Sequence, residues 1–110
     1  MVKYKQRDFE RELVRLLRKA IRAGKKTLRV SARQLSQAVT GEGGNRAPMA
    51  CSALRRYANI EMVEGSGPRR GRCLNTTLSG SSTSVTYEFF LKEFDDKVFG
   101  RLEREYLYRG

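Results

Sequence analysis

The sequence contains no histidine and no tryptophan, and only two cysteines and two prolines among its 110 residues. Without histidine, it lacks the side chain that proteins use most often for acid–base catalysis. No nucleophile is paired with a base, and the carboxylates are scattered over the surfaces of predicted helices. These absences argue against an enzyme.

Two cysteines, Cys51 and Cys73, cannot form a disulfide framework, and without histidine they cannot complete a four-ligand zinc site. The glycine-rich stretches at residues 41–45 and 65–71 lack the spacing of a phosphate loop or a dinucleotide fingerprint. We therefore expect no metal and no cofactor. No hydrophobic run resembles a signal peptide or a membrane span. The sequence predicts a cytoplasmic protein with no membrane partner, which would be nucleoid-associated in a prokaryote.

Positive charge is abundant instead. The chain has 23 Lys+Arg and 12 Asp+Glu, a net charge of +11, which attracts polyanions whatever the fold. Residues 1–30 hold eleven positive and three negative groups, and residues 65–82 hold three positive and no negative ones. Residues 83–110 hold five and six, so the C-terminal end is nearly neutral. This distribution points to a nucleic acid that contacts the N-terminal third and the loop at residues 65–72.

Hydrophobic spacing divides the chain, which has the length of one domain, into helices and strands. Helices are predicted over residues 8–23, 31–40, 47–58 and 95–108, and strands over residues 27–30, 60–64, 74–78 and 85–91. Ser31 suits the N-cap of the second helix, Gly41 suits its end, and Asn59 suits the end of the third.

Arginines form a line along the first predicted helix. At 3.6 residues per turn they fall within an arc of roughly 80°, opposite the apolar face. The arc contains Arg7, Arg11, Arg15, Arg18 and Arg22. Two interpretations are open, an ordinary solvated face or an auxiliary basic face that attracts nucleic acid.

The second and third predicted helices are expected to form a helix-turn-helix, although an ordinary three-helix core would have the same elements. With the apolar side of the third helix turned inward, the residues directed outward are Met49, Ser52, Arg55 and Arg56. Arginine can bind guanine in a bidentate manner, serine can bond a base edge or a phosphate, and methionine can contact a thymine methyl. The glycine-rich loop that follows carries Arg69, Arg70 and Arg72. We expect these to contact the DNA backbone or minor groove from a flexible wing. The alternative in both places is a set of arginines that only aids solubility.

Residues 50–57 (ACSALRRY), followed by residues 60–64 (IEMVE), resemble the recognition helix and first wing strand of the winged helix-turn-helix superfamily. The resemblance covers residues 8–91 or so. It implies an α+β fold, a three-helix core with a β-hairpin wing, to which this chain adds a C-terminal helix. We therefore expect a winged-helix nucleic-acid-binding domain over residues 1–91 and a separate helix over residues 92–110.

These features predict a sequence-specific or architectural protein that binds double-stranded DNA, either a transcriptional regulator or a nucleoid-associated protein. A ribosome- or RNA-associated winged helix is one alternative, and a protein-interaction module that uses the C-terminal helix is another. That helix carries an apolar stripe of Val98, Phe99, Leu102 and Tyr106. The stripe could form a homodimer contact, or it could fold back onto the first helix and complete the core of a monomer.

Overall fold

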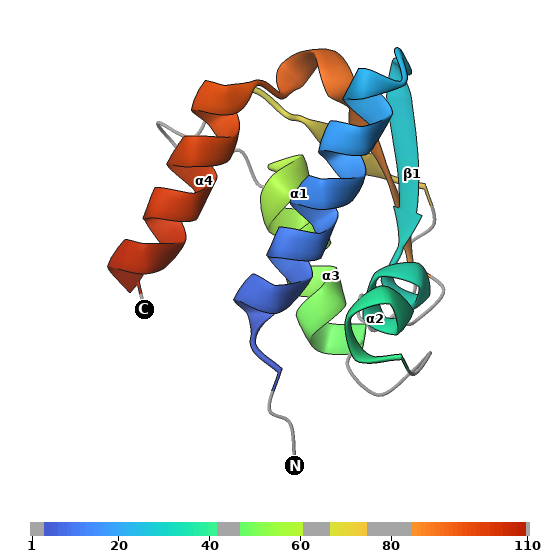
Figure 1. The fold of residues 1–110 in the computed structure, drawn as a ribbon, viewed down its shortest axis with the longest axis vertical. Coiled ribbons are helices and arrows are strands. Elements are labelled where there is room, and N and C mark those ends of the chain that lie inside the picture. Colours follow the sequence, from blue (N-terminus) through green and yellow to red (C-terminus); the bar gives the residue numbers. More distant parts are fainter. Residues whose placement is uncertain (1–3, 42–46, 61–66, 75–84, 110) are drawn as a thin grey trace.

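The computed structural model describes residues 4–41, 47–60, 67–74 and 85–109, without the side chains at positions 47–48 and 105–109. Its elements, in chain order, are α1 (Gln6–Arg22), β1 (Thr27–Ser31), α2 (Ala32–Thr40), α3 (Ala47–Ala58), β2 (Gly71–Cys73), β3 (Thr86–Phe90), a short 3-10 turn (Leu91–Glu93) and α4 (Asp96–Arg109). Over the described ranges the fold is α+β, with four α-helices and a three-stranded antiparallel sheet (Figure 1). This order is compatible with the expected winged helix.

Local chemistry fixes the helix ends. The hydroxyl of Ser31 accepts a hydrogen bond from the Gln34 backbone N–H at 2.9 Å and caps the start of α2. Gly41 ends α2 with a φ of 77°, and Asn59 follows α3 with a φ of 53°. The carboxylate of Asp95 accepts from the Val98 N–H at 2.8 Å at the start of α4. The predicted caps at Ser31, Gly41 and Asn59 are confirmed.

The sheet has the strand order β1-β3-β2, and β3 pairs antiparallel with both neighbours. The predicted strands at residues 27–30 and 85–91 are confirmed. Contrary to expectation, β2 lies at the end of the segment predicted to be a loop. Gly71 explains this strand, because a Cβ there would lie 2.8 Å from the Glu88 carbonyl oxygen and 3.1 Å from the Ala58 Cβ. Only glycine allows β2 to approach β3 and α3 so closely.

The other two predicted strands are not observed in the part of the chain that the structure describes. Residues 61–64 and 75–78 lie outside it, and Ile60 lies in a turn.

The core lies between the helices and one face of the sheet. Residues with essentially no exposed surface come from α1, β1, α2, α3, β3 and α4, and include Phe9, Leu13, Leu17, Val30, Leu35, Leu54, Phe89 and Leu102. In Figure 1, β1 runs along the right-hand edge of the molecule, and α1, α3 and α4 lie to its left. Ile21 is 37% exposed, and Ala38 is exposed as well. Because α1 and α2 pack on α3, only one side of α3 remains at the surface.

Candidate nucleic-acid interface

The third helix has one buried and one exposed side. Leu54 is fully buried and Tyr57 is 2% exposed, whereas Ser52 and Arg55 are exposed and Met49 is half-buried. The outward orientation predicted for Ser52 and Arg55 is therefore observed, whereas Met49 packs partly against the core. Their contact with a nucleic acid remains a prediction.

Arg55 lies beside the sheet. Its guanidinium interacts with the hydroxyl of Tyr87 on β3. Burial raises the pKa of Tyr87, and the hydrogen bond with Arg55 partly offsets that increase. Arg55 therefore extends from α3 toward β3.

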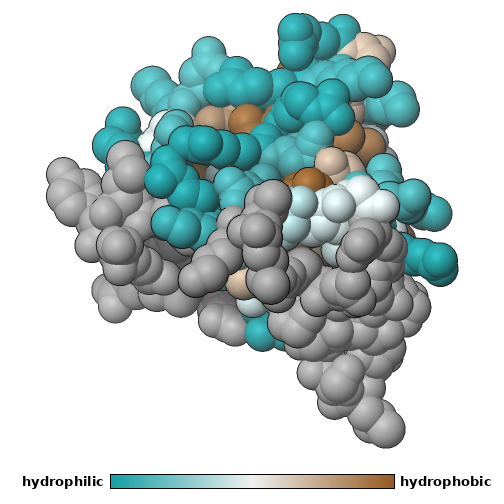
Figure 2. Space-filling view, turned by 60° about the horizontal axis from the view of Figure 1, so that its bottom comes forward, coloured by the Kyte–Doolittle hydropathy of each residue, from teal (hydrophilic) through white to brown (hydrophobic). Residues whose placement is uncertain are grey.

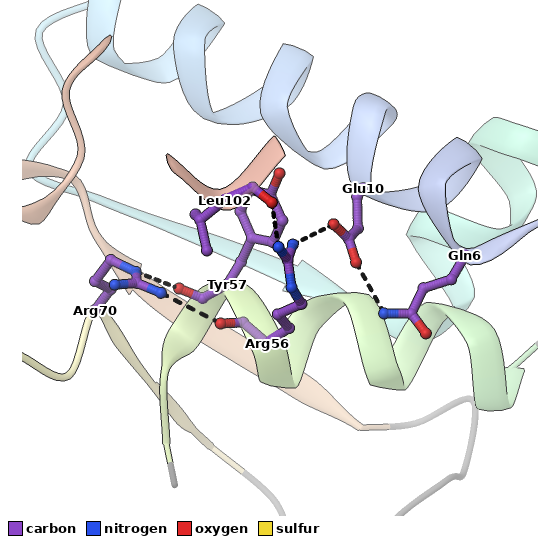
Figure 3. Close-up of polar contacts among 6 residues, drawn as sticks. All are labelled: Gln6, Glu10, Arg56, Tyr57, Arg70 and Leu102. Atoms are coloured by element: carbon purple, nitrogen blue, oxygen red, sulfur yellow. Dashed lines mark hydrogen bonds and ion pairs between the residues drawn. The ribbon is translucent and has the colours of Figure 1, made fainter. Parts of the chain in front are cut away.

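Arg56 does not point outward, contrary to the prediction. Its Nη1 donates to the Glu10 carboxylate on α1, and its Nη2 donates to the Leu102 carbonyl on α4 (Figure 3). The Arg56 side chain is 15% exposed and that of Glu10 is 5% exposed. Gln6 donates to the other oxygen of Glu10 at 2.8 Å. Arg56 thus joins α3 to α1 and α4, and it is unavailable for reading bases.

Tyr57, the next residue, belongs to the same cluster. Burial is the main reason that its pKa is raised to about 12, and the charge of Glu10 adds to the effect while Arg56 opposes it. Tyr57 is therefore a neutral phenol at ordinary pH and packs as part of the core.

The prediction for Arg70 is also wrong. Arg70 is 2% exposed and is not part of a flexible wing. Its Nε donates to the Tyr57 carbonyl at 2.9 Å, and its Nη2 approaches the Arg56 carbonyl at 3.4 Å (Figure 3). Its backbone N–H donates to the Ala58 carbonyl at 2.7 Å. The last carbonyls of a helix lack partners within the helix, and the positive guanidinium also suits the negative end of the helix dipole. Arg70 caps the C-terminal end of α3.

The other two arginines of the predicted wing are exposed. Arg69 Nη2 lies 3.5 Å from the Ile60 carbonyl, which is at best a weak contact. Arg72 lies on β2, where it forms an ion pair with Glu88 at 3.0 Å. Glu88 is also paired with Arg29 of β1 at 3.2 Å. Hydrogen bonding from Arg29 is the main reason that the pKa of Glu88 is lowered, while burial opposes the shift.

Arg29 was not among the predicted site residues. The sequence carried a signal for it, because Leu28 and Val30 point inward and the alternation of a strand places Arg29 on the opposite face.

The arginines in the line along α1 differ in their exposure and in their contacts. Arg11, Arg15 and Arg22 are exposed and Arg7 is half-buried. Arg15 is paired with Glu12 of the same helix. Arg18 lies 4.5 Å from the centre of the Phe99 ring and donates to Asp96 at 2.8 Å, so it fastens α4 to α1. The contacts of Arg15 and Arg18 do not decide between a solvated face and a basic face that attracts nucleic acid. Arg18 has a structural role, whereas the other arginines of the line are exposed or half-buried.

The apolar stripe of α4 is not a free dimer contact. Phe99 is 5% exposed and Leu102 is 2% exposed, and both belong to the core of the monomer. The Phe99 ring stacks on Phe94 with centroids 5.5 Å apart. Val98 is partly buried against the same core. The side chain of Tyr106 lies outside the described residues. The alternative expectation, that the stripe completes the core, is the one that the structure supports.

A groove of about 230 Å³ remains between α1 and α4. Arginines and carboxylates line its edges, together with Val14, Tyr57, Phe99 and Gly100. Gly100 faces open space here, since a Cβ at this position would meet only Arg104 Nη1, at 3.6 Å.

Among the residues that the structure describes, no three histidine, cysteine, aspartate or glutamate side chains form a group that could hold a metal. Cys51 is buried, which raises the pKa of its thiol, and Cys73 is half-buried. No helix in the described ranges is long and apolar enough to cross a membrane.

Hydrophilic side chains dominate the described part of the face in Figure 2. This view brings forward the end of the molecule at which α2 and the start of α3 lie (Figure 1). Hydrophobic side chains show only in small areas among the described atoms of this face.

Comparison with protein-family models, with curated proteins and with solved structures finds no match for this chain.

Proposed function

We propose that this protein binds double-stranded DNA as a winged-helix protein, in the role of a transcriptional regulator or an architectural protein. The order helix, strand, helix, helix, strand, strand supports this fold, as does an antiparallel sheet with the order β1-β3-β2. In helix-turn-helix proteins the second helix of the motif enters the major groove, and α3 corresponds to that helix.

The exposed side of α3 is the observation that carries the proposal. Ser52 and Arg55 are exposed there, while the opposite side of the helix is buried against α1 and α2. The major groove is about 12 Å wide and admits an α-helix. Arg55 has the donors to bind guanine O6 and N7, and Ser52 can bond a base edge or a phosphate. Arg69 is exposed after the end of α3 and would add a phosphate contact.

The decisive experiment is a competition assay in which duplex DNA, duplex RNA and single strands compete for the intact protein at several salt concentrations. We expect the protein to bind duplex DNA in preference to the other nucleic acids. A preferred sequence, selected from random duplexes, then serves to test Arg55→Gln. If Arg55 reaches a guanine, its loss reduces affinity by about 1–3 kcal/mol, which is about 5- to 150-fold, and relaxes the preference at that base.

Arg104→Gln is the matched control, because Arg104 is exposed on α4 and the substitution removes the same charge. Equal effects of the two variants would show that only net charge matters, and the groove assignment would be wrong. A preference for duplex RNA would instead identify the protein as an RNA-binding winged helix.

A further inference from the structure

Three charged side chains form a row across the sheet. Arg29 of β1 and Arg72 of β2 are the direct cross-strand partners of Glu88 on the central strand. Arg29 Nε donates to one oxygen of the carboxylate at 3.2 Å, and Arg72 Nε donates to the other at 3.0 Å. The arginine side chains are 68% and 58% exposed, and that of Glu88 is 11% exposed. We call Arg29, Glu88 and Arg72 the sheet row.

The sheet row lies on the face of the sheet away from the core. Successive side chains of a strand point to opposite faces. Val30, Tyr87 and Phe89 are buried in the core, so Arg29 and Glu88, which alternate with them, face the other way. The end of α3 packs on the core side, where a Cβ at Gly71 would lie 3.1 Å from the Ala58 Cβ. The sheet row and the exposed side of α3 are therefore different surfaces of the molecule.

The charge on this face is unbalanced. Glu88 is the only acidic residue in the three strands, and it stands between two arginines. The sequence around it has no acid over residues 24–41 or 65–87. Lys25, Lys26 and Arg33, in the first of these segments, are exposed. Within the sheet row, one carboxylate between two arginines leaves a net positive charge with oriented guanidinium donors.

The arginines of the sheet row carry more positive charge than the carboxylate neutralises. Glu88 is 11% exposed, so its carboxylate needs hydrogen-bond donors, and each oxygen accepts from one arginine. The two guanidinium groups are mostly exposed, and one of their two positive charges is not neutralised by an acid of the sheet. The carboxylate also holds both guanidinium groups in place, one on each side of the central strand.

We propose that the sheet row is a second nucleic-acid contact, which binds phosphates of the duplex backbone. This inference rests on the proposed function, because it concerns the same partner. Arg29 and Arg72 are attached to strands that flank β3. At about 4.8 Å per strand spacing, their backbones lie about 10 Å apart. That separation is comparable with the widths of the DNA grooves, about 6 and 12 Å, which phosphates border on both sides. Arginine binds phosphate through paired N–H groups, as it binds a carboxylate.

Glu88→Gln tests the proposal through the direction in which affinity for DNA changes. The substitution removes the negative charge and frees both arginines, so affinity for duplex DNA should increase, and the log–log salt dependence should steepen. Glu103→Gln is the matched control, because Glu103 is exposed on α4 and the substitution removes the same charge. If Glu103→Gln strengthens binding as much as Glu88→Gln does, the effect comes from net charge alone and the inference is wrong.

The double variant Arg29→Gln/Arg72→Gln should have the opposite effect. Loss of two phosphate contacts reduces the salt slope by up to about 1.8, which is an affinity loss of about 10- to 60-fold near 0.1 M salt. Arg29→Lys/Arg72→Lys should retain most of the binding, since lysine still binds phosphate as a point charge. Circular dichroism would establish that each variant is folded.

Comparison with Arg55→Gln separates the two proposals. If the intact protein fails to bind DNA, the proposed function is wrong and the sheet row has no partner. If Arg55→Gln weakens binding while the sheet-row variants all bind like the parent, the inference about the sheet row is refuted and the role of α3 stands. A reduced slope in Arg29→Gln/Arg72→Gln that adds to the effect of Arg55→Gln supports two independent contacts.

Discussion

Replacing Arg70 with methionine tests whether this arginine is part of the fold or part of a nucleic-acid contact. Methionine keeps much of the buried aliphatic volume but removes the guanidinium that bonds the Tyr57 and Arg56 carbonyls. A hydrogen bond from a charged donor contributes about 1.5–3 kcal/mol. The contact at 2.9 Å is well formed and the one at 3.4 Å is weak. We therefore expect the free energy of unfolding to fall by about 2–3 kcal/mol.

The expected change in melting temperature follows from chain length. An unfolding entropy of about 2.1 cal/mol/K per residue gives about 0.23 kcal/mol/K for 110 residues. The variant should therefore melt about 10 °C lower, as measured by calorimetry, with a lower urea midpoint and an unchanged m-value. Arg69→Met is the matched control, because it removes an exposed arginine from the adjacent position. It should change stability by no more than about 0.5 kcal/mol.

Measurement of DNA binding tests the alternative, in which Arg70 contacts nucleic acid. Measured at a temperature at which both variants are folded, Arg69→Met should weaken binding more than Arg70→Met does. If Arg70→Met is as stable as Arg69→Met and loses more affinity, then Arg70 contacts the backbone, and its assignment as the cap of α3 would be refuted.

Three further predictions concern stability. Arg56→Met should lower the free energy of unfolding by about 3 kcal/mol in urea, because it leaves buried Glu10 without its cation, and a change below 1 kcal/mol would contradict the network. Gly100→Ala should raise stability by about 1 kcal/mol, since its Cβ would meet only Arg104 at 3.6 Å, and a lower melting temperature would contradict the open space there. Because the pKa of Glu88 is lowered in the folded state, its stabilising effect is present above the unfolded pKa of about 4.3 and is lost as pH falls through the folded value. Glu88→Gln should therefore flatten the loss of melting temperature below about pH 4.5, and parallel pH curves would exclude this role.

Helix positions and ends could be predicted because they depend on neighbouring residues. The apolar spacing of α1 and the caps at Ser31, Gly41 and Asn59 are local signals, and the structure has each of them. The outward side of α3 followed from the same spacing. A period of 3.6 fixes which residues share a side, and the small apolar residues of α3 fix which side is buried.

The orientations of Arg56 and Arg70 were predicted wrongly because they depend on contacts between distant segments. Arg56 lies at the edge of the exposed side, and the two groups that bind it, Glu10 and the Leu102 carbonyl, are each 46 residues away. Arg70 follows glycine and proline residues that suggest a surface loop, yet the chain turns back onto the end of α3. Composition indicates how many positive groups a segment has. It does not indicate which of them are bonded to the protein itself.

The structural arginines and the exposed arginine of α3 are related through the orientation of one helix. Arg56 bonds α3 to α1 and α4, and Arg70 caps the end of α3. Either guanidinium could reach a phosphate only by leaving a buried carboxylate or carbonyl without its donor, which costs more than an exposed phosphate contact returns. Since counterion release depends only on cations that reach phosphates, the net charge of +11 overstates the number of contacts available. The anchored arginines would act on binding indirectly, because they fix the rotation of α3 that keeps Ser52 and Arg55 at the surface.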